Sequence, residues 1–171
     1  MGKSLLILGA GGHGKVVKEV ALAMKNASEK VYDRVDFLDD NSGEAIGRIS
    51  EAVLYKNQYD EAFCGIGNNQ FRKNILEKLA VLGYKIPVLI HPTAYVSNTA
   101  IIEKGTVVEP KAIVNANTTV GSGSIISVGA IVDHNVIIGD YCHINAGAIC
   151  KAGSKLEACI KLEAGEVVKG Y

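Results

Sequence analysis

The chain has no excess of charge of either sign, because its 171 residues include 18 Lys and Arg against 18 Asp and Glu. Nothing in this composition draws the protein to nucleic acid or to an anionic membrane, so we expect neither as a partner. No apolar run approaches the roughly 18 residues that a membrane-spanning helix requires, and we therefore expect no membrane span.

The N-terminus lacks the features of a targeting segment. The apolar stretch at residues 4–8 is too short for a secretory signal, and it runs into a glycine-rich loop. An N-myristoylation signal needs Ser or Thr at position 6, and this chain has Leu6 there. We therefore expect a cytoplasmic protein.

From Ile90 onward, every sixth residue is apolar. Fourteen successive positions obey this rule, and at 48% apolar composition chance agreement has odds of roughly two in ten thousand. A second column, four residues further on, holds only small or β-branched side chains. The first column is Ile90, Val96, Ile102, Val108, Val114, Val120, Ile126, Val132, Ile138, Ile144, Cys150, Leu156, Leu162 and Val168, and the second runs from Ala94 to Ser154.

This six-residue period predicts a parallel β-helix. Each unit forms one short strand and one tight corner, with the large aliphatic side chain inside and the small one at the corner. Three units complete a coil of about 18 residues. A β-sandwich is the alternative, but its strands would alternate with a period of two and would be irregularly spaced.

The four cysteines show no spacing typical of a metal site, and we expect no metal. Cys142 and Cys150 fall at interior positions of the repeat, and Cys64 ends an apolar run. These three residues are predicted to be buried and reduced. Cys159 lies in neither column, and no neighbouring feature supports a catalytic role for it.

Before Ile90, short apolar runs alternate with helical patterns. The expected strands are residues 4–8, 35–38, 61–64 and 85–89, and the expected helices are residues 15–24 and 70–82. This alternation predicts a small parallel sheet, half of a Rossmann-like domain. Pro87 and Pro92 bracket the change of pattern, so we place an α/β domain at residues 1–88 and the β-helix domain at residues 89–171.

A glycine-rich loop follows the first predicted strand. Gly9, Gly11 and Gly14 fit the G-x-G-x-x-G pattern, in which backbone amides and a helix N-terminus face an anion. Asp39 ends the second strand, where a ribose hydroxyl would lie. These features predict a nucleotide pocket, and the alternative is that the glycines only permit close packing of strand and helix. His13 either donates to a phosphate or is a solvated residue of the first helical turn.

About 88 residues supply only half of a double Rossmann sheet. A mononucleotide or nucleotide-sugar therefore suits this domain better than a full NAD(P) molecule. A small NAD-binding regulator remains a weaker alternative.

His134 is the strongest candidate for chemistry in the β-helix. It should project outward, and stacking by 18 residues places Ala116 and Ala152 on either side, which leaves open space around the imidazole. An imidazole there suits general-base catalysis near neutral pH. The alternative is a solvated surface residue.

His143 should stack between Ile125 and Lys161 by the same rule. A β-helix alone encloses no pocket, but its flat faces can pack around a threefold axis and form clefts between copies. We therefore expect a homotrimer.

Several motifs together resemble the NeuD/PglD-type sugar O/N-acyltransferases of bacterial surface-glycan synthesis. This family includes sialic acid O-acetyltransferases and N-acetyltransferases acting on UDP-linked 4-amino sugars. The resemblance covers nearly the whole chain. The motifs are residues 8–15 (LGAGGHGK), 37–40 (FLDD), 65–69 (GIGNN), 89–92 (LIHP), 132–134 (VDH) and 138–145 (IGDYCHIN).

The resemblance implies an acetyl-CoA-dependent homotrimer with a nucleotide-sugar-binding domain and a left-handed β-helix, an exception to the usual right-handed crossover. It gives His134 the place of the general base. It assigns contacts with the acetyl donor to His143, Ser127 and Ala152. The residues implied to bind the nucleotide-sugar are Gly11, Gly12, His13, Asp39, Asp40, Gly67 and Asn68.

Two positions depart from the family pattern. Relatives of the N-acetyltransferase branch often have an acidic residue where this chain has Asn135, and relatives often have Asn where it has Ser127. The column of small residues also fails after Ser154, so coenzyme binding is expected to be weaker or differently arranged. The alternative to an enzyme is therefore a non-catalytic nucleotide-sugar-binding scaffold with a degenerate CoA site.

Overall fold

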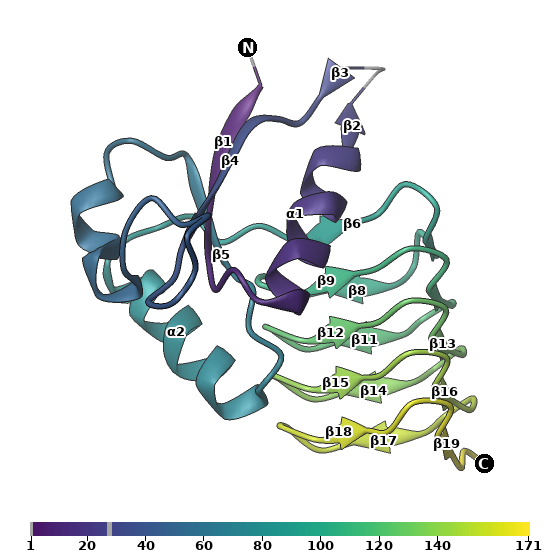
Figure 1. Ribbon diagram of the computed structural model, residues 1–171. Helices are drawn as coiled ribbons and strands as arrows, with labels where there is room; N and C mark the ends of the chain where they lie inside the picture. Colours follow the sequence, from purple (N-terminus) through teal and green to yellow (C-terminus); the bar gives the residue numbers. More distant parts are fainter. Residues whose placement is uncertain (1, 27–28) are drawn as a thin grey trace.

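The computed structural model describes residues 2–26 and 29–171, and in it a small α/β part lies against one face of a three-sided coil (Figure 1). The α/β part has three parallel strands, one short hairpin and three helical segments. Its elements are β1 (Lys3–Leu8), α1 (Gly12–Ala23), β2 (Lys25–Asn26), β3 (Glu29–Lys30), β4 (Tyr32–Leu38), η1 (Ile49–Tyr55), β5 (Glu61–Cys64) and α2 (Asn69–Val81).

The α/β part is built around β1, the central strand in the order β4–β1–β5. Both faces of β1 are covered, which explains why its last four residues are all apolar and fully buried. Leu5 and Ile7 belong to the same apolar cluster as α1, whereas Leu6 and Leu8 belong to the cluster that contains α2. Both predicted helices and three of the four predicted strands are therefore confirmed.

The predicted strand at residues 85–89 is wrong. Lys85 makes only an isolated bridge to Glu61, and Leu89 instead begins β6, the first strand of the coil. Pro87 lies between them and has no N–H to donate to a ladder, so the segment cannot continue as a strand of the small sheet. The short hairpin and η1 were not predicted, because segments of this length carry no clear hydrophobic period.

The remaining chain is a left-handed parallel β-helix with fourteen two-residue strands in three parallel sheets. The first sheet comprises β6 (Leu89–Ile90), β9 (Val107–Val108), β12 (Ile125–Ile126), β15 (His143–Ile144) and β18 (Lys161–Leu162). The second comprises β7 (Tyr95–Val96), β10 (Ile113–Val114), β13 (Ile131–Val132), β16 (Ile149–Cys150) and β19 (Val167–Val168). The third comprises β8 (Ile101–Ile102), β11 (Thr119–Val120), β14 (Ile137–Ile138) and β17 (Lys155–Leu156).

The interior of the β-helix follows the predicted repeat. The aliphatic column and the small corner residues form one apolar cluster. At three corners the residue is Thr or Ser and its hydroxyl donates to a carbonyl 15 residues further along the chain, as Thr118 does to Asp133 at 2.7 Å; the other two are Thr106 and Ser124. Cys142 and Cys150 are buried in this interior, as predicted, and Cys159, which lies in neither column, is exposed.

One column on the outside of the β-helix determines where the α/β part can lie. Along the first sheet, successive outward positions hold Leu89, Val107, Ile125, His143 and Lys161. The three apolar residues are fully buried in the same cluster as β1 and α1. The α/β part therefore covers the upper coils of this sheet, and the two polar residues lie at the lower edge of the covered area (Figure 1).

We predict that Gly14→Ala lowers the free energy of unfolding by about 1–3 kcal/mol. An added Cβ would lie 2.0 Å from the carbonyl oxygen of Gly9, so α1 would have to move away from the loop that follows β1. Gly12→Ala is the matched control on the same helix, because a Cβ there meets no atom within 4 Å. Urea denaturation measures both variants, and equal stability of the two would contradict the close packing.

Candidate functional site

Three of the predicted site residues meet in a cleft between the start of α2 and the lower coils of the β-helix. We call it the loop–coil cleft, and its volume is about 570 Å³. Its lining residues are Gly67, Asn68, Asn69, Gln70, His143, Cys159 and Lys161. Gly67 and Asn68, which were predicted to bind the nucleotide-sugar, therefore share one cleft with His143, which was predicted to contact the acetyl donor.

The wall of the cleft from the α/β part is the N-terminus of α2. The side chain of Asn68 caps the helix by accepting from the backbone N–H of Phe71 at 2.9 Å. A Cβ added to Gly67 would meet nothing within 4 Å, so the backbone is open to a ligand at this point. The Asn69 amide donates to the carbonyl of Cys159 at 2.9 Å and ties the helix start to a corner of the β-helix.

His143 forms the opposite wall. Its Nε2 lies 3.1 Å from the hydroxyl of Ser127, so the structure brings these two predicted residues together. Burial lowers the pKa of His143 to about 4, and the positive charges of Arg72 and Lys161 act in the same direction. The imidazole is therefore neutral at pH 7, able to donate from one nitrogen and accept at the other.

His13 lies behind the cleft. Of the two alternatives for His13, the solvated first-turn residue is excluded, because the side chain is only 16% exposed and its ring centroid lies 6.4 Å from that of His143. Binding of a phosphate by His13 stays a prediction. Its Nδ1 is 3.5 Å from a carboxylate oxygen of Glu109. Burial, followed by His143 and Arg72, lowers the pKa of His13 to about 4, so this contact is not an ion pair at neutral pH.

Glu109 and Arg72 were missed in the sequence. Burial raises the pKa of the Glu109 carboxyl, whose second oxygen accepts from the backbone N–H of Val128 at 2.9 Å. Both residues act across the contact between the α/β part and the β-helix. No short motif or period records such a contact between distant segments.

The glycines of the first loop divide into two groups. Gly9, Gly14 and Gly65 pack against one another so closely that a Cβ on any of them would clash. Gly11 and Gly12 have open space on the side where a Cβ would be. The close packing of strand and helix is therefore confirmed for Gly9 and Gly14, and a nucleotide pocket at Gly11 and Gly12 stays a prediction.

Asp39 and Asp40 bind backbone N–H groups of the glycine-rich loop and of the segment that follows β4. The carboxylate of Asp39 accepts from the backbone N–H groups of Ala10 and Asn41, both at 2.8 Å, and these bonds lower its pKa. Asp40 accepts from the N–H of Ile49 at 3.2 Å. Asp39 thus fixes the glycine loop, and a role in binding ribose stays a prediction.

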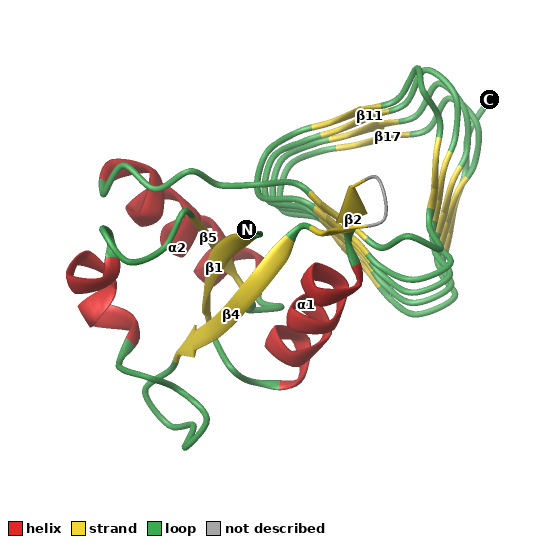
Figure 2. Cartoon of the chain, turned by 90° about the horizontal axis from the view of Figure 1, so that it is seen from above, coloured by secondary structure: helices red, strands yellow, loops and turns green. Residues whose placement is uncertain are grey.

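His134 lies away from the loop–coil cleft. It is exposed at the corner between β13 and β14, whereas the sheet that contains His143 forms the opposite side of the triangle (Figure 2). Its Nδ1 is 3.2 Å from the amide nitrogen of Asn135. Ala152 is on the next coil of this corner, where the carbonyl of His134 accepts from Gly153. Within one copy of the chain, His134 and Ala152 therefore lie apart from His143.

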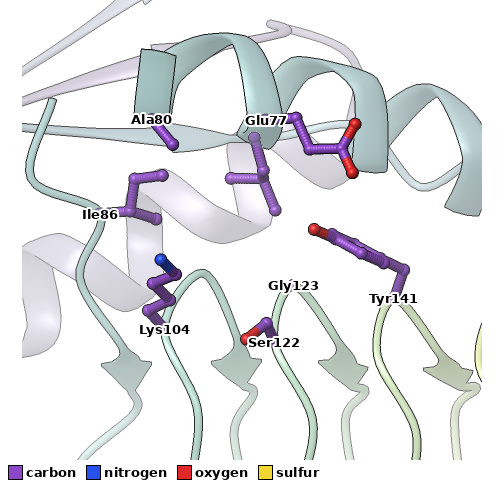
Figure 3. Close-up of a pocket in the computed structure, with 8 residues that line it drawn as sticks. Glu77, Ala80, Ile86, Lys104, Ser122, Gly123 and Tyr141 are labelled. Carbon is purple, nitrogen blue, oxygen red and sulfur yellow. The ribbon is translucent and has the colours of Figure 1, made fainter. Parts of the chain in front are cut away.

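A smaller hollow of about 130 Å³ lies between α2 and another corner of the β-helix (Figure 3). Leu76, Ala80 and Ile86 form its apolar side, and Lys104 and Tyr141 lie at its edge. None of the predicted site residues lines it, so the larger loop–coil cleft is the better candidate. Within residues 2–26 and 29–171, no group of three or more His, Cys, Asp or Glu side chains could hold a metal ion. No helix in the same ranges is long and apolar enough to cross a membrane.

Comparisons with known proteins match both parts of the chain. Residues 4–79 match the model of the PglD N-terminal domain. The chain is 31% identical over 110 residues to UDP-N-acetylbacillosamine N-acetyltransferase of Bacillus subtilis, which covers 62% of this chain. The match spans about half of that curated relative, 51% of its length.

Solved structures match over almost the full length. The acetyltransferase domain of PglB from Neisseria gonorrhoeae, in complex with acetyl coenzyme A, is 35% identical with a TM-score of 0.91, covering 99% of this chain and 83% of that one. A mutant of perosamine N-acetyltransferase from Caulobacter crescentus, in complex with CoA and GDP-perosamine, is 25% identical with a TM-score of 0.86. That match covers 98% of this chain and 89% of the other.

We predict that His13 and His143 make the protein less stable in mild acid. The unfolded chain takes up protons at these positions near pH 6.5, whereas the folded protein does so only near pH 4. Stability is therefore complete above pH 6.5 and falls as the pH drops towards 4. Between pH 6.5 and pH 4, a His13→Gln/His143→Gln double variant should lose less free energy of unfolding than the wild type, by on the order of 1–3 kcal/mol for each histidine. Urea denaturation at several pH values measures this, and identical pH slopes would contradict it.

Proposed function

The chain belongs to the NeuD/PglD family of sugar acyltransferases, and we propose that it transfers the acetyl group of acetyl-CoA to an amino or hydroxyl group of a sugar or nucleotide-sugar in bacterial surface-glycan synthesis. The observation that carries the proposal is the loop–coil cleft, in which Gly67 and Asn68 of the nucleotide-sugar motif face His143. The protein would act in the cytoplasm.

The proposed reaction is attack of the acceptor nitrogen or oxygen on the thioester carbonyl. The new C–N or C–O bond forms as the C–S bond breaks, and CoA leaves as its thiol. His134 would take the proton from the acceptor and return it to the departing sulfur. An imidazole that is neutral at pH 7, as at His143, suits a hydrogen bond to the thioester carbonyl, whose oxygen gains negative charge in the transition state.

The nucleotide-sugar is proposed to bind along the α/β part. The open backbone at Gly11 and Gly12 lies at the start of α1, and Gly67 and Asn68 lie directly before α2. Two helix N-termini therefore offer N–H groups to the phosphates of a nucleotide-sugar. His13, Asp39 and Asp40 were also predicted to bind this substrate; we propose that they shape the loops that hold it.

We further propose a homotrimer. Within one copy, His134 lies far from the loop–coil cleft, so a second copy would have to supply the cleft that His134 serves. The second sheet of the β-helix supports this: its outward positions are all apolar and none of its strands is covered by the α/β part (Figure 2). These residues are Tyr95, Ile113, Ile131, Ile149 and Val167. A continuous apolar face of this kind marks a surface for another protein chain. A second copy packed on it would bring its own cleft towards His134, Ala152 and the bound acetyl donor.

The proposed function predicts acetyl transfer in a screen of acetyl-CoA with UDP-amino sugars, other nucleotide-amino sugars and free sialic acids. With the acceptor found, His134→Ala should lower kcat by roughly a hundred- to ten-thousand-fold and leave the KM for acetyl-CoA nearly unchanged. His143→Ala should raise the KM for acetyl-CoA more than it lowers kcat. Near-normal turnover of His134→Ala at saturating acceptor would show that another residue is the base.

The same screen separates an enzyme from a scaffold. A scaffold would bind nucleotide-sugars but show no detectable binding at millimolar acetyl-CoA. Calorimetric titration of the wild-type protein with acetyl-CoA measures this difference directly.

A further inference from the structure

Arg72 is an arginine of α2 buried at the contact between the α/β part and the β-helix. Its residue is 1% exposed, whereas the side chain of Arg34 is half exposed. Within the described ranges, Arg72 forms no ion pair with a carboxylate. Burial lowers its pKa to about 10, so it stays charged at neutral pH.

The charge of Arg72 is instead satisfied by six oxygen atoms. Three belong to the loop before α2 and to the start of the helix, and three belong to two successive coils of the β-helix. The acceptors are the carbonyls of Ile66 (3.3 Å) and Gly67 (2.9 Å), the Asn69 side chain (2.9 Å), and the carbonyls of Gly123 (2.6 Å), Tyr141 (3.1 Å) and Cys142 (3.1 Å). The planar guanidinium, with five N–H donors in a fixed fork, is the side chain that can serve such a set.

These bonds hold the backbone on both sides of the loop–coil cleft. On one side, the carbonyls of Ile66 and Gly67 are turned towards Arg72. Because each peptide unit is planar and trans, the N–H groups of Gly67 and Asn68 then point the opposite way, away from the guanidinium. On the other side, the two bound carbonyls of the lower coil belong to the residues directly before His143.

We propose that Arg72 is a positioning residue, which fixes the loop at residues 65–69 at a set distance and angle from His143. Its effect on kinetics rests on the proposed function. Its effect on the geometry of the cleft does not, because that follows from the six bonds alone. No contact places Arg72 on a reacting atom, so it acts only through the groups that it holds.

The charge of Arg72 has a second consequence at His143. The groups that face this imidazole are Arg72 from α2, His13 from α1, and Lys161 and Glu163 from the next coil. Arg72 is the largest charged contributor that lowers the pKa of His143, after burial. A variant that removes the charge should therefore raise the pH at which His143 titrates.

The two roles of Arg72 can be separated by two substitutions. Arg72→Lys keeps the positive charge but has only three donors on one nitrogen, so it cannot serve both sides of the cleft. Arg72→Met removes the charge and the donors together. The apolar contact beside them remains in both variants, because Leu76 still packs near Gly123 and Ile86 near Gly105. Arg34→Lys, on an exposed arginine paired with Asp36, is the matched control.

The test measures the NMR titration of His143, amide hydrogen exchange at Gly65 and Phe71, whose N–H groups are hydrogen-bonded at the two ends of the loop, and steady-state kinetics. We expect both Arg72 variants to show exchange at least tenfold faster in the loop, and Arg72→Met alone to titrate at higher pH. With an acceptor in hand, Arg72→Lys should lose roughly ten- to a hundred-fold in kcat/KM for the acceptor. Arg34→Lys should match the wild type in every measurement.

Wild-type loop exchange in Arg72→Lys would overturn the proposal, and so would an unchanged kcat/KM. If Arg72→Met does not fold, Arg72→Lys alone decides between these outcomes. If the wild-type protein transfers acetyl to no acceptor, the proposed function fails. The exchange and titration results then still decide whether Arg72 positions the loop.

Discussion

The contact between the α/β part and the first sheet of the β-helix is the interaction on which the candidate site depends. Leu89, Val107 and Ile125 stack outward on three successive coils and are fully buried beneath the α/β part. The same column continues with His143 and Lys161, where the apolar cover ends. Burial of apolar area drives the two parts together without fixing their angle, because it has no direction. We infer that directional hydrogen bonds at the edge of the contact, above all those of Arg72, fix the angle between the two parts.

The β-helix could be predicted in detail because its neighbours are encoded by a constant spacing. Once the period of six is recognised, stacking by 18 residues follows, and His143 does pair with Ile125 and Lys161. The strand expected at residues 85–89 failed because an apolar run alone does not show which sheet it joins. The two alternatives for His13 stayed open for a related reason: the first turn of a helix looks solvated until the partner surface is known.

The candidate site could be predicted only in part, because its residues lie far apart in the sequence and short motifs do not record contacts between distant segments. Motifs singled out Gly67 and Asn68 for the nucleotide-sugar and His143 for the acetyl donor, and only the structure shows that these residues share the loop–coil cleft. No motif indicated that one chain would carry His134 on the opposite side of the triangle. The apolar face of the second sheet is a signal in the pattern that supports the proposed contact with a further copy, since outward residues of an uncovered sheet are normally polar.

The central claim is that a complete site needs His134 from one copy and His143 from another. The most direct test is co-expression of His134→Ala with His143→Ala, assayed at an acetyl-CoA concentration well below the KM of the His143→Ala variant, where each variant alone has little activity. Random assembly would leave both histidines intact in roughly a quarter of the sites, so the mixture should regain about a quarter of the wild-type rate. If the mixture stays as inactive as the separate variants, the two histidines act within one copy and the account is contradicted.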